Sequence, residues 1–325
     1  MIISRTPFRV SFAGGGTDLR AFYQHEPGAV VSTTINKYMY LTVNERFDHT
    51  VRVSYSKTEI VETAGEVEHP LVREALKKAG IANGIEVTSI SDIPAGTGFG
   101  SSSSFTVGLL NALYAYTGTY APPERLAQEA CEIEIDIVGE PIGKQDQYIA
   151  AYGGLQYIRF NPDESVFVDP VVCTAELKRA LGDRLLLFYT GITRSASEIL
   201  NEQRKETEQG NTIDFLRKMA YLAGEIRRIF QEGRDLDEFG ELLHEGWMLK
   251  RELASGITNA LIDAAYERAR NAGAVGGKIL GAGGGGFLLV YGREDKHPAI
   301  RKALADLREV PFDIEPQGTK IVHVS

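Results

Sequence analysis

The chain has 325 residues, of which 43% are hydrophobic, 24% charged and 9% aromatic, a composition typical of a globular protein that can bury a sizeable core. Its formal net charge of -9 excludes a general nucleic-acid or anionic-membrane surface, because such a surface needs a clustered basic face. Two cysteines without CxxC spacing, Cys131 and Cys173, indicate a reducing compartment, so we expect a cytoplasmic protein. We read no secretory signal and no membrane span, since no apolar run reaches about 18 residues.

The order of predicted elements mixes strands and helices without regular alternation, which favours an α+β fold over a doubly wound sheet. Strands are expected at 2–12, 29–34, 38–44, 51–55, 85–90, 155–160, 166–168, 185–189, 287–291, 312–314 and 320–324. Helices are expected at 69–79, from the serine run 101–104 to Gly118, from Pro122 to Gly139, over most of 195–271 and at 298–308. The composition becomes helical and rich in Glu, Arg, Leu and Ala beyond residue 184. We therefore predict two domains, 1–184 and 185–325.

Glycine is over-represented and unevenly distributed. The chain holds 34 glycines, against roughly 23 expected for an average protein of this length. The surplus lies in three clusters, at 14–16, 96–100 and 273–286. Glycine in such loops indicates either flexibility or a place where another group approaches the backbone closely.

The middle cluster lies between a predicted strand and a predicted helix, where alternating glycines and the helix N-terminus predict a phosphate-binding loop. The alternative is a tight turn followed by an N-cap. No Walker sequence occurs in the chain. The predicted phosphate-binding residues are Pro94, Gly96, Gly98, Gly100, Ser101, Ser102, Ser103 and Ser104.

The third cluster contains a literal G-x-G-x-x-G at 281–286, but it precedes a strand rather than a helix and so lacks the context of a dinucleotide-binding fingerprint. It is either a flexible hairpin loop or a place where another group approaches the backbone. In the first cluster, Thr17 and Asp18 follow three glycines at the end of a strand. Asp18 can accept hydrogen bonds from sugar hydroxyls or cap the next segment.

Candidate acidic residues lie between the middle and last clusters. At 100° per residue, Glu132 projects away from the buried stripe of its helix and is expected to be solvated. Glu134 and Asp136 lie on the shoulders of that stripe, and Glu134 can either approach a hydrated Mg²⁺ or form a surface salt bridge. Asp146 follows a turn containing Gly and Pro, and is either a general base or a helix N-cap.

Taken in order, the segments 6–18, 94–104 and 278–286 resemble the three motifs of the GHMP kinases. The resemblance implies a two-domain fold: an N-terminal ATP-binding domain of the ribosomal S5 domain 2-like type, and a C-terminal ferredoxin-like domain with extra helices. It also implies ATP and Mg²⁺ as cofactors. With the motifs matched, we expect the three glycine loops to meet in one cleft around ATP and the sugar phosphate, with close backbone contact as the reason for glycine. Matched position by position, it assigns Ser102 and Glu134 to magnesium, Asp146 and Arg9 to catalysis, and Asp18 to sugar binding. Further substrate contacts are expected at Gly15, Gly16, Thr17, Lys144, Gly283 and Gly284.

Within this group, the segments 11–18, 35–38, 141–148 and 188–194 look like those of the D-glycero-D-manno-heptose 7-phosphate kinases. That resemblance implies transfer of the ATP γ-phosphate to the anomeric O1, giving heptose 1,7-bisphosphate for nucleotide-activated heptose synthesis. Kinases of fucose or another free sugar, and a non-catalytic nucleotide sensor, are the alternatives. Gly15 and Gly16, where galactokinases carry His and Glu, leave room for a bulkier substrate. We expect a small-molecule sugar phosphate as substrate, no nucleic-acid or membrane partner, and a monomer or homodimer. The candidate cations for its phosphate are Lys144, Arg20, Arg194 and Lys278.

Overall fold

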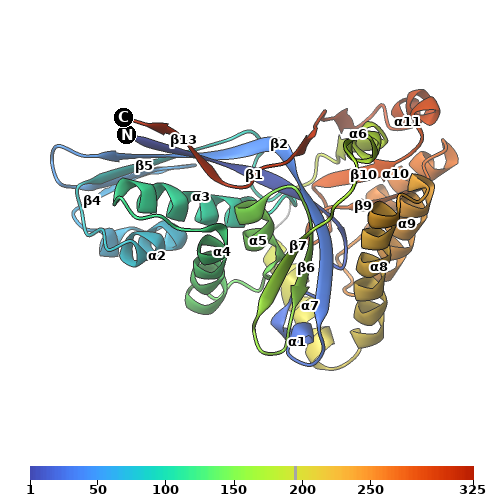
Figure 1. Ribbon diagram of the computed structural model, residues 1–325, viewed down its shortest axis with the longest axis horizontal. Helices are drawn as coiled ribbons and strands as arrows, with labels where there is room; N and C mark the ends of the chain where they lie inside the picture. The colour runs from blue at the N-terminus through green and yellow to red at the C-terminus, as the bar shows by residue number, and fades with distance from the viewer. Residues whose placement is uncertain (194–195) are drawn as a thin grey trace.

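The structure is a computed structural model that describes residues 1–193 and 196–325. Its strands form two sheets, a long one that crosses the molecule and a smaller one beside helices α9 and α10 (Figure 1). The long sheet contains β1 (Ile2–Ala13), β2 (Gly28–Glu45), β3 (Val51–Ser54), β4 (Thr58–Val61), β5 (Ile85–Ser91), β6 (Leu155–Phe160), β7 (Val166–Pro170), β12 (Ile314–Glu315) and β13 (Lys320–Val324). The smaller sheet contains β8 (Leu185–Tyr189), β9 (Gly276–Ile279), β10 (Phe287–Tyr291) and β11 (Arg308–Glu309), in the order β11-β8-β10-β9.

Helices cover both sheets. They are α1 (Arg20–Tyr23), α2 (Pro70–Lys78), α3 (Ser101–Tyr116), α4 (Pro123–Cys131), α5 (Gln145–Tyr152), α6 (Ala175–Asp183), α7 (Ala196–Glu208), α8 (Ile213–Glu232), α9 (Leu236–Arg251), α10 (Ala260–Asn271) and α11 (His297–Ala303). Short 3₁₀ turns lie at η1 (Ala64–Glu66) and η3 (Glu294–Lys296), and a π-helical segment, η2 (Glu132–Ile137), continues α4. Helices α2 to α5 lie on one side of the long sheet and α8 lies on the other (Figure 1).

Strand β2 is the centre of the long sheet. Its first half pairs with β6, from Gly28 opposite Phe160 to Thr33 opposite Leu155, and its second half pairs with β5. We predicted two strands, 29–34 and 38–44, separated at Asn36 and Lys37, and this division is wrong. Asn36 instead bonds to Asp313 through backbone and side chain, at 2.9 and 2.8 Å, where β2 changes partners without ending.

The end of the chain returns to the first sheet. β13 pairs antiparallel with β1 and β12 pairs with β2, so the two termini lie next to each other (Figure 1). The division into 1–184 and 185–325 stays a prediction. Because β12 and β13 pair with β2 and β1, a division into two domains has to group these C-terminal strands with the long sheet.

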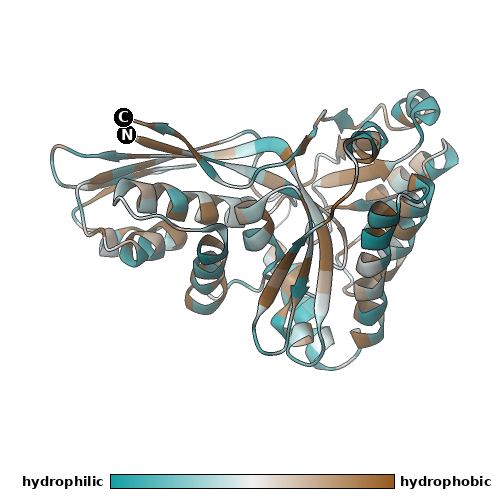
Figure 2. Cartoon of the chain, in the orientation of Figure 1, coloured by the Kyte–Doolittle hydropathy of each residue, from teal (hydrophilic) through white to brown (hydrophobic). Residues whose placement is uncertain are grey.

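Helix α8 shows how the apolar spacing builds the core. Leu216, Met219, Ala223, Ile226 and Phe230 recur at intervals of three or four residues, and all are buried. The helix ends at Gly233, whose φ of 65° is the left-handed conformation common at helix C-termini. Much of the strands is hydrophobic, while α8 and α9 show both hydrophobic and hydrophilic residues (Figure 2).

The expected α+β class is confirmed, although the sequence patterns missed several short elements. Strand β4 and helices α5 and α6 were not predicted. The helix expected to run from Pro122 to Gly139 changes to π geometry at Glu132, where Val138 N bonds to Ile133 O at 2.9 Å. Within the described ranges, no helix is both long and apolar enough to cross a bilayer.

Candidate active site

The three glycine loops meet at one cavity, as the sequence predicted. Gly15 and Gly16 from the first loop, Gly96, Gly98 and Gly100 from the second, and Gly281, Gly283 and Gly285 from the third line a space of about 300 Å³. Loops at least 80 positions apart in sequence therefore line one cavity. A cavity of this size accommodates small ligands.

The second and third loops touch through their backbones. A Cβ added to Gly98 would lie 2.5 Å from the Leu280 carbonyl oxygen, and one added to Gly281 would lie 2.5 Å from the Gly98 Cα. Both glycines also have positive φ, 88° and 72°. Close approach and backbone conformation thus both require glycine here. Residues 281–286 do form the hairpin loop between β9 and β10, and these backbone contacts with the second loop hold it in place.

An aromatic side chain anchors the second loop. Phe99 is 1% exposed and lies between Phe8 of β1 and Phe287 of β10, with ring centroids 6.4 and 4.7 Å away. The loop is therefore fixed to both sheets at its middle residue. This leaves the glycines on either side of Phe99 facing the cavity.

The loop leads directly into α3, and Ser101, Ser102 and Ser103 of the first helical turn line the cavity. The N-cap is Gly100 in the left-handed conformation, and no side chain caps the helix. The amides of the first turn are consequently available to an anion, and the helix dipole adds partial positive charge. This geometry suits a phosphate group better than the alternative of a turn with a serine N-cap.

Arg9 of β1 and Asp146 of α5 form the main ion pair of the cavity. Arg9 Nε donates to Asp146 Oδ1 and Nη2 donates to Oδ2, both at 2.7 Å. Arg9 Nη1 also donates to the Gly98 carbonyl at 2.5 Å, which ties the pair to the second loop. Asp146 is the second residue of α5, whose N-cap is Lys144, so the predicted alternative of an Asp146 N-cap is wrong.

Asp18 lies on the same wall and is 3% exposed. Its Oδ1 accepts from Gly16 N at 2.8 Å and its Oδ2 accepts from Gln145 N at 3.2 Å. Burial raises the pKa of this carboxyl, against the lowering effect of those amides. The helix that follows, α1, has Leu19 as its N-cap, so Asp18 does not cap that helix.

Comparison with known proteins identifies the architecture. Residues 67–154 match the family model described as GHMP kinases N terminal domain, and residues 222–309 match that described as GHMP kinases C terminal. A mevalonate kinase of Thermococcus sibiricus is 31% identical over an alignment of 262 positions that covers 77% of this chain and 74% of the relative.

The chain belongs to the GHMP kinases. It is therefore a phosphotransferase that uses ATP, and the expected two-domain kinase fold is confirmed. A Campylobacter jejuni protein named D-glycero-alpha-D-manno-heptose 7-phosphate kinase is 27% identical over 93% of both chains. A crystal structure described as a D-glycero-D-manno-heptose 1-phosphate kinase from Bacteroides thetaiotaomicron has a TM-score of 0.83 and 23% identity over all of both chains.

In this GHMP kinase, Glu134 is not the surface residue that one alternative proposed. It is fully buried in η2, and its carboxylate accepts from Ser102 Oγ at 2.5 Å and from Gln147 Nε2 at 2.6 Å. The assumption of 100° per residue placed Glu134 on the helix shoulder, and it failed because the turn is π-helical. Burial raises the pKa of Glu134 to about 7. Asp136 forms a surface pair with Arg20, 3.1 Å apart.

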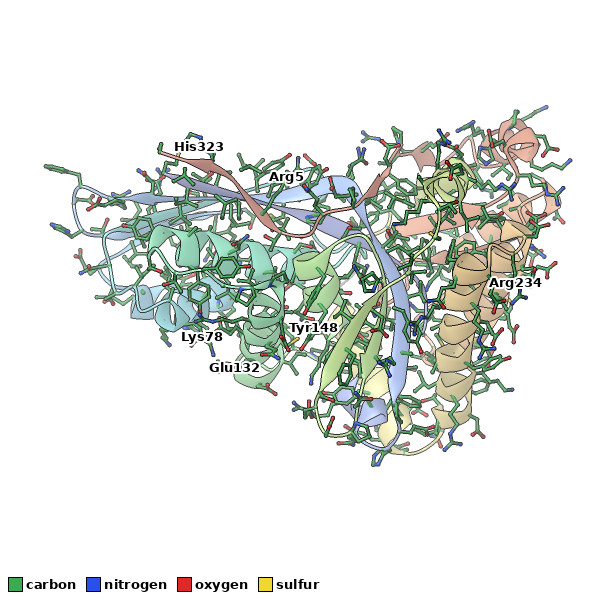
Figure 3. The ribbon with its side chains drawn as sticks, in the orientation of Figure 1. Arg5, Lys78, Glu132, Tyr148, Arg234 and His323 are labelled. Carbon is green, nitrogen blue, oxygen red and sulfur yellow. The ribbon has the colours of Figure 1, made fainter. Side chains whose placement is uncertain are left out.

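Glu132, two residues before Glu134, was expected to be solvated. It is exposed and forms an ion pair with Lys78 of α2 at the outer surface, where Figure 3 labels both residues. It faces away from the cavity and does not line it.

Besides Glu134, which is buried next to Ser102, five of the predicted ligand-binding residues do not line the cavity. Thr17 Oγ1 donates to the Gly14 carbonyl at 2.8 Å, and Ser104 Oγ donates to the Pro7 carbonyl at 3.1 Å. The Pro94 carbonyl accepts from Thr97, and Gly284 N donates to Ile257. Through these bonds the four residues hold the loops in shape. The fifth is Lys144.

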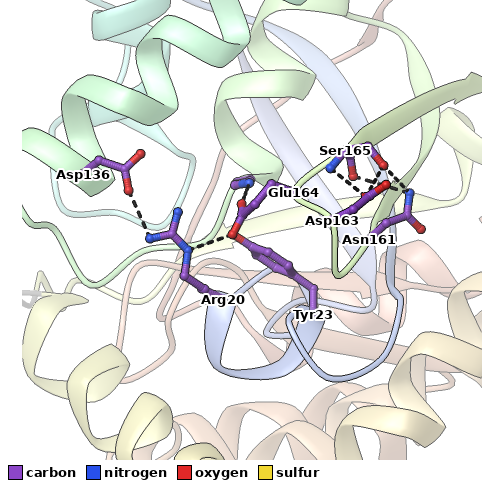
Figure 4. A network of polar contacts seen from close by, with 8 residues as sticks. Arg20, Tyr23, Asp136, Asn161, Asp163, Glu164 and Ser165 are labelled. Carbon is purple, nitrogen blue, oxygen red and sulfur yellow. Dashed lines mark hydrogen bonds and ion pairs between the residues drawn. The ribbon is translucent and has the colours of Figure 1, made fainter.

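Lys144 and Arg20, two of the candidate phosphate-binding cations, are bound to acidic side chains. The Lys144 ammonium pairs with Glu164 and lies over the Tyr23 ring, 4.7 Å from its centre. Arg20 also bonds to Glu164, at 3.1 Å (Figure 4). In this arrangement Lys144 is paired with Glu164 and does not line the cavity. A third candidate, Arg194, lies outside the described residues.

The fourth candidate, Lys278, does line the cavity, and Lys250, Gln203 and Ser11 line it without having been predicted. All four are buried polar residues. For Lys250 a signal existed: it continues the apolar stripe Leu243–Trp247 of α9 at the next core position, where a lysine is unusual. Gln203 occupies the equivalent place on α7, four residues after the buried Ile199.

Proposed function

We propose that this kinase transfers the γ-phosphate of ATP to the anomeric O1 of D-glycero-D-manno-heptose 7-phosphate, giving heptose 1,7-bisphosphate and ADP. The observation that carries the proposal is the position of the Arg9–Asp146 pair, between the loop that leads into α3 and the loop that holds Asp18. The heptose phosphate as acceptor is supported by the likeness to the Campylobacter jejuni relative, which covers 93% of both chains.

Asp146 is proposed to accept the proton of the O1 hydroxyl while the new O–P bond forms and the bond from the γ-phosphorus to ADP breaks. Each of its carboxylate oxygens already accepts one bond from Arg9 and retains a further lone pair for the substrate hydroxyl. Arg9 holds the carboxylate in place and offsets negative charge on the transferring group. Phosphoryl transfer depends mainly on positioning and electrostatics, so such fixed groups suit it.

The amides and hydroxyls at the start of α3 are proposed to bind the ATP phosphates. Ser102 and Glu134 fit Mg²⁺ through their donor set, because they offer a hydroxyl and a carboxylate oxygen and Mg²⁺ prefers oxygen ligands together with phosphate. The described side chains give Glu134 hydrogen bonds but no cationic partner. When bound, the metal would neutralise charge on the phosphates. Ser102 would face it from the cavity wall.

The acceptor hydroxyls of the sugar are assigned to the part of the cavity lined by Gly15, Gly16 and Asp18. The two glycines present no side chains there, so a seven-carbon sugar has more space than beside larger residues. Asp18 offers carboxylate oxygens, each of which already accepts one backbone amide. Its fixed orientation favours recognition of specific hydroxyls over general attraction of charge.

Release of ADP from Mg-ATP, measured against a panel of hexoses, heptoses and their phosphates, tests the proposal. The expected result is the highest kcat/KM with heptose 7-phosphate, with the product phosphorylated at C1 by phosphorus NMR. A preference for free fucose or for another unphosphorylated sugar would replace the proposed acceptor. Absence of turnover with every sugar, combined with tight ATP binding, would favour a nucleotide sensor.

A further inference from the structure

Two buried lysines face the cavity from the half of the chain that supplies the third glycine loop. Lys250 of α9 and Lys278 of β9 are 6% and 4% exposed, and both line the cavity. Lys250 Nζ donates to the Gly281 carbonyl, and Lys278 Nζ donates to the Phe12 carbonyl at 3.2 Å. Each ammonium has three N–H donors, so each keeps donors beyond those bonds.

Neither lysine has a carboxylate ion-pair partner within the ranges 1–193 and 196–325. The other cations near the cavity do: Arg9 binds Asp146, while Lys144 and Arg20 bind Glu164. The two lysines therefore stand apart as buried positive charges that only neutral carbonyls contact. Such charges are costly to bury unless a ligand or side chain of opposite sign offsets them.

Burial and the neighbouring positive charges lower the pKa values of both lysines. Burial lowers the pKa of Lys250 to about 8, and the positive charge of Arg9 acts in the same direction. Burial also lowers the pKa of Lys278, with Lys250 and Arg9 contributing next. Asp18 opposes both shifts, but its oxygens are bonded to backbone amides, and the oxygens of Asp146 are bonded to Arg9. Three basic side chains thus share one region of the cavity wall, so without a ligand the charged forms of both lysines are disfavoured.

Two more polar side chains on this wall lack partners. Ser11 Oγ and Gln203 Nε2 are buried and form no hydrogen bond with any described residue. Both line the cavity, Ser11 from β1 and Gln203 from α7. Because buried polar groups are normally hydrogen-bonded, these atoms also indicate that a polar ligand completes the site. Glu140, the remaining carboxylate of the wall, is partly exposed and bonds to neither lysine.

We propose that Lys250 and Lys278 together bind a phosphate group in this cavity. A phosphate carries up to two negative charges and several acceptor oxygens, which match two ammonium groups with spare donors. The source of that phosphate rests on the proposed function, since both the acceptor's own phosphate and the terminal phosphate of ATP have this chemistry. The lysines themselves are a binding site whichever group occupies them.

The first test uses inorganic phosphate alone, titrated calorimetrically into the protein without nucleotide or sugar. Lys250→Met and Lys278→Met should each weaken phosphate binding about ten- to a hundredfold, the range expected for loss of a charge-assisted hydrogen bond. Lys302→Met, at an exposed position of α11, is the matched control and should bind like the unmodified protein. Thermal unfolding checks the fold, and Lys250→Gln and Lys278→Gln serve where a Met variant does not fold. Unchanged phosphate binding in folded variants overturns the proposal.

Kinetics then distinguish the two sources. If the lysines hold the acceptor's phosphate, the variants should raise KM for heptose 7-phosphate about ten- to a hundredfold, with KM for ATP and turnover of unphosphorylated heptose unchanged. If they hold the terminal phosphate of ATP, kcat or the KM for ATP should change with both acceptors. Should heptose 7-phosphate not be a substrate at all, the proposed function fails, while the inorganic phosphate titration still decides the lysine site.

Discussion

Arg9 and Asp146 lie 137 residues apart in sequence and meet through two hydrogen bonds of 2.7 Å each. This side-by-side arrangement of a guanidinium and a carboxylate fixes both groups in orientation as well as distance. One residue comes from the first strand and the other from a short helix that the sequence patterns missed. The pair therefore couples the long sheet to the α5 segment at the cavity.

If Asp146 is the general base, Asp146→Asn should lower kcat by roughly 10² to 10⁴. The amide is similar in size but cannot take up a proton in the same way, and its nitrogen cannot accept from Arg9. ATP binding, measured by calorimetry, should change little. Asp136→Asn is the control, since that carboxylate pairs with Arg20 at the surface. Near-normal turnover of Asp146→Asn at saturating substrate would remove the base role.

Arg9→Lys should also lower activity, although it preserves the positive charge. A lysine has no planar fork, so it cannot bond to both Asp146 oxygens and to the Gly98 carbonyl at once. We expect kcat/KM to fall about ten- to a hundredfold, with most of the loss in kcat. Steady-state kinetics with both substrates varied measures this. Full activity in the variant would mean that charge alone, and not fixed geometry, is what Arg9 supplies.

The contact between the second and third glycine loops predicts a difference between two Gly→Ala variants. Gly118→Ala should destabilise the protein by about 1–2 kcal/mol, because its φ is 71° but nothing lies within 4 Å of the added carbon. Gly98→Ala adds a clash with the Leu280 carbonyl and should cost about 1–3 kcal/mol more. Urea unfolding measures both. Equal losses would show that the loops can separate without cost.

Much of this arrangement could be predicted from sequence. The glycine loops were assigned to one cleft because the three segments, taken in order, resemble the GHMP kinase motifs; glycine composition alone would not have brought distant loops together. The long-range consequences were harder to predict. Nothing in the spacing around Glu134 indicates that the helix changes to π geometry, and so the sequence left open whether Glu134 points inward or lies at the surface. Likewise, the engagement of Lys144 with Glu164 depends on how the β6–β7 hairpin folds over α1, which periodicity does not reveal.

Lys250 shows a different limit. The sequence places Lys250 on the apolar stripe of α9, but a lysine at the edge of such a stripe is usually solvated. Only the packing of the neighbouring strands shows that this lysine is buried. Its role therefore depends on tertiary packing. The same holds for Ser11, whose alternation on β1 does not indicate that its hydroxyl lacks a partner.

Glu134→Gln should separate the proposed metal role from a structural one. The glutamine keeps an oxygen for Ser102, and the Gln147 amide can turn to offer its unpartnered Oε1, so the fold should be retained. The Mg²⁺ concentration that gives half-maximal activity should rise on the order of 10- to 100-fold. The Mg²⁺ dependence of ATP affinity is a second readout. Glu132→Gln, on the same turn but exposed, should leave both values unchanged, and an unchanged Mg²⁺ requirement in Glu134→Gln would contradict the assignment.

The buried charge of Lys250 predicts how stability depends on pH. Its pKa falls from 10.5 to about 8 on folding, so below pH 8 the ammonium is charged in both states and the folded state bears the full cost. Between pH 8 and 10.5 the folded protein loses the proton first, and the free energy of unfolding rises with pH. Above pH 10.5 Lys250 is neutral in both states, so burying its charge no longer lowers the free energy of unfolding. The drop in pKa corresponds to about 3 kcal/mol, the most that removing the charge can gain.

Lys250→Met should therefore raise the free energy of unfolding at pH 7, in the absence of ligands, by up to about 3 kcal/mol. This advantage over the unmodified protein should shrink steadily between pH 8 and 10.5. Urea unfolding at several pH values measures it, with Lys302→Met as the exposed control whose difference should stay flat. A destabilised Lys250→Met protein at pH 7 would mean that packing of the lysine stem and its bond to Gly281 outweigh the cost of burying its charge.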